Sequence, residues 1–131
     1  MSTTDSHVVH LTDIHAVAVP VNDVDRALDF YVGTLGLRVR MDVPFGDGDR
    51  WVEVAPGDAR TSVALIRARA GVPAGVDTGI RLTSTDAVAD HAALRGAGAD
   101  VDPEVMQLPG TPPMFGVRDP DGNALVVVGA G

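Results

Sequence analysis

The sequence predicts an α+β fold made of two similar units, each with one strand, one helix and three further strands. The order of strand-like and helix-like segments over residues 13–68 recurs over residues 78–129, and an aspartate precedes each helix. A segment rich in glycine and proline, residues 69–77, separates the two units. We therefore expect a single domain of two duplicated units, preceded by a flexible tail over residues 1–12.

The first unit begins with an apolar strand, "HAVAVPV" over residues 15–21. Asn22 or Asp23 can cap the helix that follows, which we expect over residues 23–34, and Gly36 ends it. Alternating or apolar runs separated by turn-rich segments then predict strands over residues 37–43, 50–54 and 61–68.

The second unit repeats this order of elements. A strand is predicted over residues 78–84, and Asp86 can cap a helix over residues 86–97. Three further strands are predicted over residues 99–105, 113–118 and 123–128. Because five elements recur in the same order, we interpret the chain as a duplication.

Composition limits the partners that the protein can have. The chain has 131 residues, no cysteine and a formal net charge of −8. Without cysteine, disulfides, thiolate catalysis and cysteine-bound zinc are excluded. The acidity disfavours nucleic acid, and no apolar run is long enough to span a membrane. The N-terminal segment lacks the pattern of a signal peptide, so we expect a cytoplasmic protein.

Two longer motifs resemble the vicinal oxygen chelate superfamily, the glyoxalase, bleomycin-resistance protein and extradiol dioxygenase fold. They are "VPVNDVDRALDFYVGTLGLRV" early in the chain and "DPDGNALVVV" near its end, and the likeness covers about residues 13–128. The resemblance implies that each unit curls its mixed sheet into a half-cup, with the helices on the outer faces and the ligand or metal inside. It also implies a homodimer with the pocket at or near the interface, where the first unit of one chain faces the second unit of the other.

The positions that bind metal in this superfamily carry no metal-binding side chains in this chain. The resemblance places these positions at Ala16, at Gly79, at Val126 and at either Ala64 or Leu65. Divalent cations need several nitrogen or oxygen ligands at fixed geometry, which these residues do not offer. We therefore expect no metal and no other cofactor.

The four histidines are predicted to be solvated or capping residues and not metal ligands. His15 lies one residue before Ala16, and strand alternation places it on the helix-facing side with Val17, unless a bulge turns it into the cup. His7 and His10 lie in the predicted tail, and His91 lies on the second helix.

Strand alternation also identifies the residues that would line the cup. The apolar residues Val52, Val54, Ile80, Leu82, Phe115 and Val117 are predicted to face the helices. The opposite set, with one aromatic residue from the preceding loop, gives the predicted ligand-binding residues Phe45, Trp51, Glu53, Arg81, Thr83, Met114 and Arg118. Trp51 could instead only fill space, and Glu53 and Arg81 could instead neutralise each other.

Two functions are compatible with this set of residues. The first is a metal-free protein that sequesters an antibiotic or another aromatic or cationic small molecule, with no catalytic residue. The alternative is a lyase, isomerase or dioxygenase that has an atypical metal site or uses Glu53 as a general base. The missing metal ligands favour the binding protein.

Overall fold

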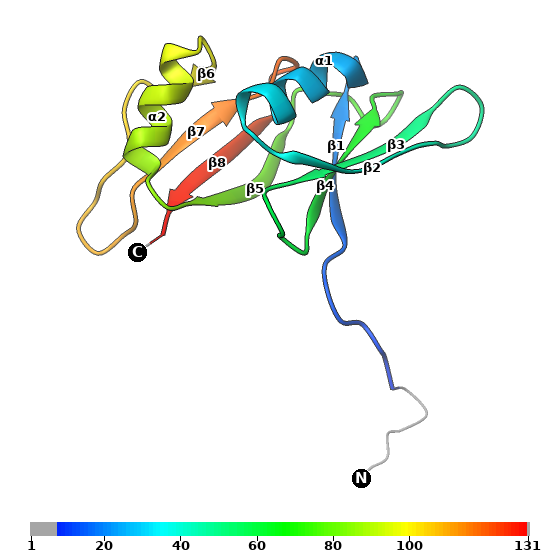
Figure 1. The fold of residues 1–131 in the computed structure, drawn as a ribbon, viewed down its shortest axis with the longest axis horizontal. Coiled ribbons are helices and arrows are strands. Elements are labelled where there is room, and N and C mark those ends of the chain that lie inside the picture. The colour runs from blue at the N-terminus through cyan, green and yellow to red at the C-terminus, as the bar shows by residue number, and fades with distance from the viewer. Residues whose placement is uncertain (1–7, 131) are drawn as a thin grey trace.

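The computed structural model describes residues 8–130 and shows an α+β fold of two βαβββ units, which confirms the predicted class (Figure 1). The first unit contains β1 (Ala16–Val21), α1 (Val24–Leu28), the π-helix η2 (Asp29–Thr34), β2 (Arg38–Pro44), β3 (Arg50–Ala55) and β4 (Ser62–Arg67). The second contains β5 (Asp77–Ser84), α2 (Ala87–Gly96), β6 (Asp100–Val101), β7 (Met114–Arg118) and β8 (Ala124–Gly129). His7 and most of the predicted tail lie outside the described residues.

The two sheets have the same strand order, β1-β4-β3-β2 in one and β5-β8-β7-β6 in the other. In each sheet the first strand is parallel to the last strand of its unit, and the remaining pairs are antiparallel. The two sheets lie side by side, and residues 8–15 extend away from both (Figure 1). The repeated order supports the duplication predicted from the sequence.

Both helices begin at the predicted aspartates. The Asp23 carboxylate accepts a hydrogen bond from the backbone N–H of Arg26 at 3.1 Å, and Asp86 accepts one from Ala89 at 3.0 Å. Such caps satisfy backbone donors that have no partner within the first turn of a helix.

The first helix continues as a π-helix after α1, which the sequence analysis did not predict. The backbone N–H of Leu35 bonds to the carbonyl of Phe30, five residues earlier, at 2.9 Å. The consecutive side chains of Phe30 and Tyr31 are both buried in this segment, and their rings meet edge to face with centroids 5.2 Å apart.

The prediction of a strand over residues 99–105 is wrong for most of that range, because β6 covers only Asp100–Val101. Pro103 has no N–H to donate to β7, so it interrupts the ladder. Pairing resumes only as a single bridge between Met106 and Met114.

The two units share one hydrophobic core. The side chains predicted to face the helices are largely buried there: Val19, Val21, Val52, Val54, Phe115 and Val117 are at most 2% exposed. Ile80 and Leu82 pack against the same cluster and are partly buried. The core-facing sides of both sheets therefore follow the predicted alternation.

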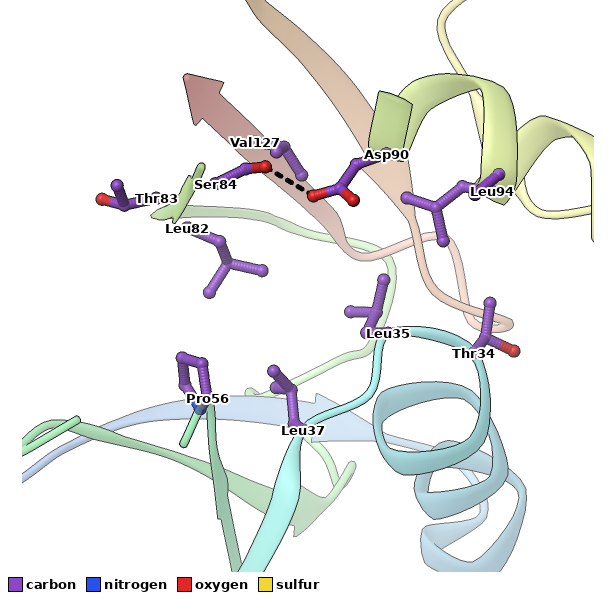
Figure 2. A pocket seen from close by; sticks show the side chains of 11 residues that line it. Thr34, Leu35, Leu37, Pro56, Leu82, Thr83, Ser84, Asp90, Leu94 and Val127 are labelled. Atoms are coloured by element: carbon purple, nitrogen blue, oxygen red, sulfur yellow. Dashed lines mark hydrogen bonds between the residues drawn. The ribbon is translucent and has the colours of Figure 1, made fainter. Parts of the chain in front are cut away.

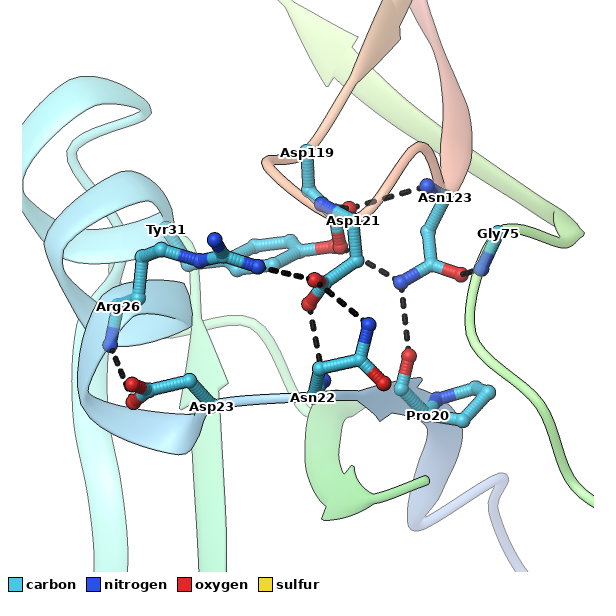
Figure 3. A network of polar contacts seen from close by, with 9 residues as sticks. All are labelled: Pro20, Asn22, Asp23, Arg26, Tyr31, Gly75, Asp119, Asp121 and Asn123. Atoms are coloured by element: carbon cyan, nitrogen blue, oxygen red, sulfur yellow. Dashed lines mark hydrogen bonds and ion pairs between the residues drawn. The ribbon is translucent and has the colours of Figure 1, made fainter. Parts of the chain in front are cut away.

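A buried polar network joins the turn between β7 and β8 to the first unit (Figure 3). The Asp119 carboxylate accepts hydrogen bonds from the Tyr31 hydroxyl at 2.9 Å and from Asn123 Nδ2 at 2.8 Å. Asn123 is fully buried, and its Nδ2 also donates to the carbonyl of Pro20 at 2.8 Å. The Asn123 side-chain oxygen accepts the backbone N–H of Gly75 at 2.8 Å.

A second carboxylate of the same turn extends the network to the start of the first helix. Asp121 accepts hydrogen bonds from the backbone and the side-chain amide of Asn22, at 3.0 and 3.1 Å, and it pairs with Arg26. The "DPDGN" turn thus contacts β1, the first helix and the segment between the units.

Replacing Tyr31 with phenylalanine is expected to destabilise the fold by about 1.5 to 3 kcal/mol, because the buried Asp119 carboxylate loses a donor. Burial and the adjacent Asp119 raise the pKa of Tyr31 above its ordinary value, so the hydroxyl keeps its proton. Urea unfolding measures the loss. The control is Asp58→Asn, at an exposed site, with an expected change within about 0.5 kcal/mol. Equal losses in the two variants would show that the Tyr31 hydroxyl contributes nothing to the link between the units.

Candidate functional site

One row of side chains defines the open face of the first sheet, on the side away from the core. Across the four strands Ala18 pairs with Ala64, Ala64 with Glu53, and Glu53 with Met41. The adjacent row, formed by Val19, Leu65 and Val52, is fully buried in the core. Alternation therefore places Glu53 and Trp51 on the open face.

A bulge in β2 adds two apolar residues to this face that the sequence analysis missed. The pairing register between β2 and β3 shifts between Val39 and Met41. After the shift Met41 pairs with Glu53 and Val43 pairs with Trp51, so both side chains join the open face. They are 40% and 44% exposed.

A hollow of about 370 Å³ opens on this face, a size typical of small-molecule sites. It is lined by Ala18, Phe45, Asp49, Arg50, Trp51, Ile66, Arg67 and Arg69. The rings of Phe45 and Trp51 lie with centroids 5.5 Å apart at an interplanar angle of 55°. Phe45 is 59% exposed, so the loop before β3 presents an aromatic ring at the mouth of the hollow.

The carboxylate of Glu53 is buried, at 3% exposure, and holds two neighbouring side chains in place. Its Oε2 accepts a hydrogen bond from the Trp51 indole N–H at 2.6 Å and lies 3.0 Å from Nε2 of His15. Burial by itself raises the pKa of this carboxyl, but the hydrogen bonds from Trp51 and His15 outweigh it and lower the pKa below its ordinary value. A carboxylate in this state is a weak base, so the geometry disfavours Glu53 as a general base.

The prediction that His15 faces the helices is wrong, because its ring reaches Glu53 on the open face. His15 precedes the first residue of β1, so strand alternation does not determine where its side chain points. The imidazole is 77% exposed. Its Nε2 can donate to the Glu53 carboxylate when that nitrogen carries the proton. Glu53 and Arg81, which could have neutralised each other, have different partners. Glu53 contacts His15, and the Arg81 guanidinium donates to the carbonyl of Gly79 at 2.9 Å.

The other predicted site residues lie in separate places on the chain. Arg81 and Thr83 border a hollow of about 400 Å³ that also includes residues of the turn between β3 and β4. Met114 lines another hollow of about 400 Å³ on the second sheet, and Arg118 pairs with Asp102 at 2.5 Å. Of the seven predicted residues, Phe45, Trp51 and Glu53 lie together on the first sheet, and Arg81 and Thr83 share a different hollow.

Asp102, which the sequence analysis did not single out, fills space on the open face of the second sheet. Its carboxylate accepts the backbone N–H of Gly116 at 2.8 Å, and a Cβ atom at that glycine would lie only 2.9 Å from Asp102 Oδ2. The hydrogen bond from Arg118 lowers the pKa of Asp102. Nε2 of His91 lies 2.6 Å from the Asp102 carbonyl oxygen. The room left by Gly116 therefore accommodates a side chain of the protein itself.

A smaller cavity of about 200 Å³ lies between the two units (Figure 2). Its lining includes Leu35 and Leu37 from the first unit and Leu82 and Leu94 from the second, and the Ser84 hydroxyl contacts Asp90 beside it at 2.5 Å. Its volume is below the range of drug-sized ligands. The leucines of its lining belong to the shared core or pack against it. We interpret it as imperfect packing between the units.

The residues present do not fit the metal of the resembled family. Ala16, Ala64, Leu65, Gly79 and Val126 have no donor atoms in their side chains. His15 and Glu53 lie together, but within residues 8–130 no three histidine, aspartate or glutamate side chains gather as a metal would require.

Comparisons with known proteins support the fold. The sequence model of the Glyoxalase/Bleomycin resistance protein/Dioxygenase superfamily matches residues 13–127. The structure of TnmS3, an antibiotic binding protein from Streptomyces sp. CB03234, is 32% identical with a TM-score of 0.84, over 95% of this chain and 100% of that one.

Two further solved structures are similar over most of the chain. A glyoxalase/bleomycin resistance protein from Streptomyces sp. CB03234 is 35% identical with a TM-score of 0.76, over 88% of this chain and 99% of that one. A superfamily member from Sphaerobacter thermophilus DSM 20745 is 31% identical with a TM-score of 0.85, over 92% of this chain and 98% of that one. No curated protein matches the chain.

The lowered pKa of Glu53 predicts a pH-dependent contribution to stability. The ionised carboxylate is favoured in the folded state, so its contribution is present above the unfolded pKa, near 4.3, and is lost as the pH falls through the folded value. Urea unfolding at several pH values is therefore expected to show Glu53→Gln less stable than the wild type at pH 7, with the gap closing below about pH 4. Glu104→Gln, at an exposed glutamate, is the matched control. A gap that stays constant with pH would contradict the assignment.

Proposed function

This chain belongs to the Glyoxalase/Bleomycin resistance protein/Dioxygenase superfamily, and we propose that it binds a small aromatic molecule, of the antibiotic type, without a metal. The observation that carries this proposal is the aromatic pair of Phe45 and Trp51 over the hollow of the first sheet. Flat aromatic ligands gain large contact area and favourable stacking from such rings. The similarity to an antibiotic binding protein supports the same kind of ligand.

The orientation of Trp51 suits a binding role better than simple space filling. Its indole N–H is bonded to the buried Glu53 carboxylate, so the ring is held in one position beside the hollow before any ligand arrives. A side chain fixed in advance loses less conformational entropy on binding. Glu53 therefore acts in this proposal as a positioning residue for Trp51.

The absence of donor side chains at the family's metal positions supports binding over metal-dependent catalysis. A lyase or dioxygenase of this family would need ligands at Ala16, Gly79 and Val126, where this chain has none. The low basicity of Glu53 removes support from the metal-free enzymatic alternative.

We also propose that two chains form the complete cup, in the cytoplasm. The open face of the first sheet exposes Met41, Val43 and Phe45, apolar side chains that a second chain would cover. The cysteine-free composition fits a reducing compartment. No helix within residues 8–130 is long and apolar enough to cross a membrane.

Trp51 is expected to be essential for affinity but not for folding. Phenylnaphthylamine, an uncharged aromatic fluorophore, is expected to quench the fluorescence of Trp51, the only tryptophan. Trp51→Leu, followed by the probe's own emission because the variant has no tryptophan, should weaken probe binding about tenfold, because stacking and contact area are both lost. The variant should still fold, with a lower melting temperature because the buried Glu53 carboxylate loses a donor. Leu108→Ala, at an exposed apolar site outside the hollow, serves as the control. Affinity lost only in proportion to lost folded protein would contradict the binding role.

Native mass spectrometry of untagged protein is expected to give twice the 13.5 kDa of one chain, with no added metal mass. One zinc, nickel or iron per chain that disappears in His15→Ala would overturn the metal-free proposal. A monomeric mass at micromolar concentration would overturn the two-chain cup.

A further inference from the structure

We propose that the hollow beside Trp51 selects aromatic ligands that carry an acidic group, such as a carboxylate, sulfonate or phenolate, held by Arg67 and Arg69. This inference rests on the proposed small-molecule function and specifies the ligand class of the same site. The reason is that some charged groups around the hollow are already held by ion pairs, whereas others remain available to a ligand.

Arg50 lines the hollow, but its guanidinium is already paired. It donates to Asp42 at 2.8 Å and to Asp25, on the first helix, at 2.7 Å. Both nitrogens of the fork, Nη1 and Nη2, are used in these contacts, and Nε donates to Asp42 as well. Arg50 is therefore a link between β3, β2 and the helix and is not free to bind a ligand.

The charge that stays available at the rim is positive. Arg67 pairs with Asp49 at 2.8 Å, and the two side chains are 61% and 42% exposed. Arg69 is exposed, and its guanidinium contacts no acidic side chain within residues 8–130.

An acidic ligand can use both arginines at low cost. Ion pairs between exposed side chains contribute little, so a ligand acid can replace Asp49 on Arg67 with little loss. A guanidinium also binds a carboxylate or sulfonate through two parallel hydrogen bonds, which fixes the orientation of the ligand.

A cationic ligand, which the sequence analysis also allowed, finds no comparable partner. Asp49 is the one acidic residue of the lining, against Arg50, Arg67 and Arg69, so a cation that displaced Arg67 from Asp49 would still meet an excess of positive charge. Glu53 is buried beneath Trp51 and His15, whose donors occupy its Oε2. A cation at the rim would also be repelled by Arg69.

Three aromatic probes that differ in charge test this inference: anilinonaphthalene sulfonate, its uncharged analogue phenylnaphthylamine, and the cationic acridine proflavine. Titrations follow the quenching of Trp51. The sulfonate is expected to bind about tenfold more tightly than the uncharged analogue, because it gains hydrogen bonds to charged donors, and proflavine is expected to bind most weakly.

Variants at the rim separate the charge effect from the aromatic one. Arg69→Gln should weaken sulfonate binding about threefold to tenfold and leave phenylnaphthylamine binding unchanged, because only the ionic contact is lost. Asp49→Asn, which frees Arg67, should strengthen sulfonate binding. Arg38→Gln, at an exposed arginine outside the lining, is the matched control.

The acid selectivity would be overturned if the sulfonate and its uncharged analogue bound equally well, or if Arg69→Gln left sulfonate binding unchanged. Either result would still agree with an aromatic binding site at Trp51. Failure of all three probes to quench Trp51 would instead overturn the proposed function on which this inference rests.

Discussion

The buried carboxylate of Asp119 is the contact on which the placement of the two units depends. A buried charge is tolerated only when hydrogen bonds satisfy it, and Asp119 accepts from the Tyr31 hydroxyl, from the Asn123 side chain and from the backbone N–H groups of Asp121 and Asn123. Three of these donors belong to its own turn, but Tyr31 belongs to the first helix. The carboxylate is therefore fully satisfied only when the second unit docks against the first, and Asn123 adds a bond to Pro20 at the end of β1.

This docking determines which faces of the two sheets are covered. The core-facing sides of both sheets meet in one cluster, so the opposite faces are left open. The hollow with Trp51 belongs to the first sheet and the hollow with Met114 to the second, and these two hollows share no lining residue. Each open face thus resembles half of a site, which is why the binding proposal and the two-chain proposal depend on each other.

The sequence predicted the regular features and missed the irregular ones. Periodic apolar residues and capping aspartates identified the units and the core-facing sides, because those patterns come directly from helix and strand geometry. The bulge before Met41 shifts alternation by one residue, and no residue type marks it. His15 lies just outside β1, where alternation does not apply. Asp102 was overlooked because its contact with Gly116 lies just before the bend at Pro103, where the alternation of a strand ends.

Glu53 lies outside the lining of the first hollow but contacts Trp51 within it, and its separation from the exposed arginines of the lining limits how a ligand can bind. The negative charge of Glu53 is buried and covered by Trp51 and His15, whereas Arg67 and Arg69 lie exposed in the lining. A ligand with an apolar body and an acidic end has one favourable orientation, with its rings on Trp51 and its acid toward the arginines. The reverse orientation would bring the acid toward Glu53, where repulsion is strongest because burial reduces screening by water. A hollow with only aromatic walls would bind flat molecules in several orientations, so the separated charges are what would give this site specificity.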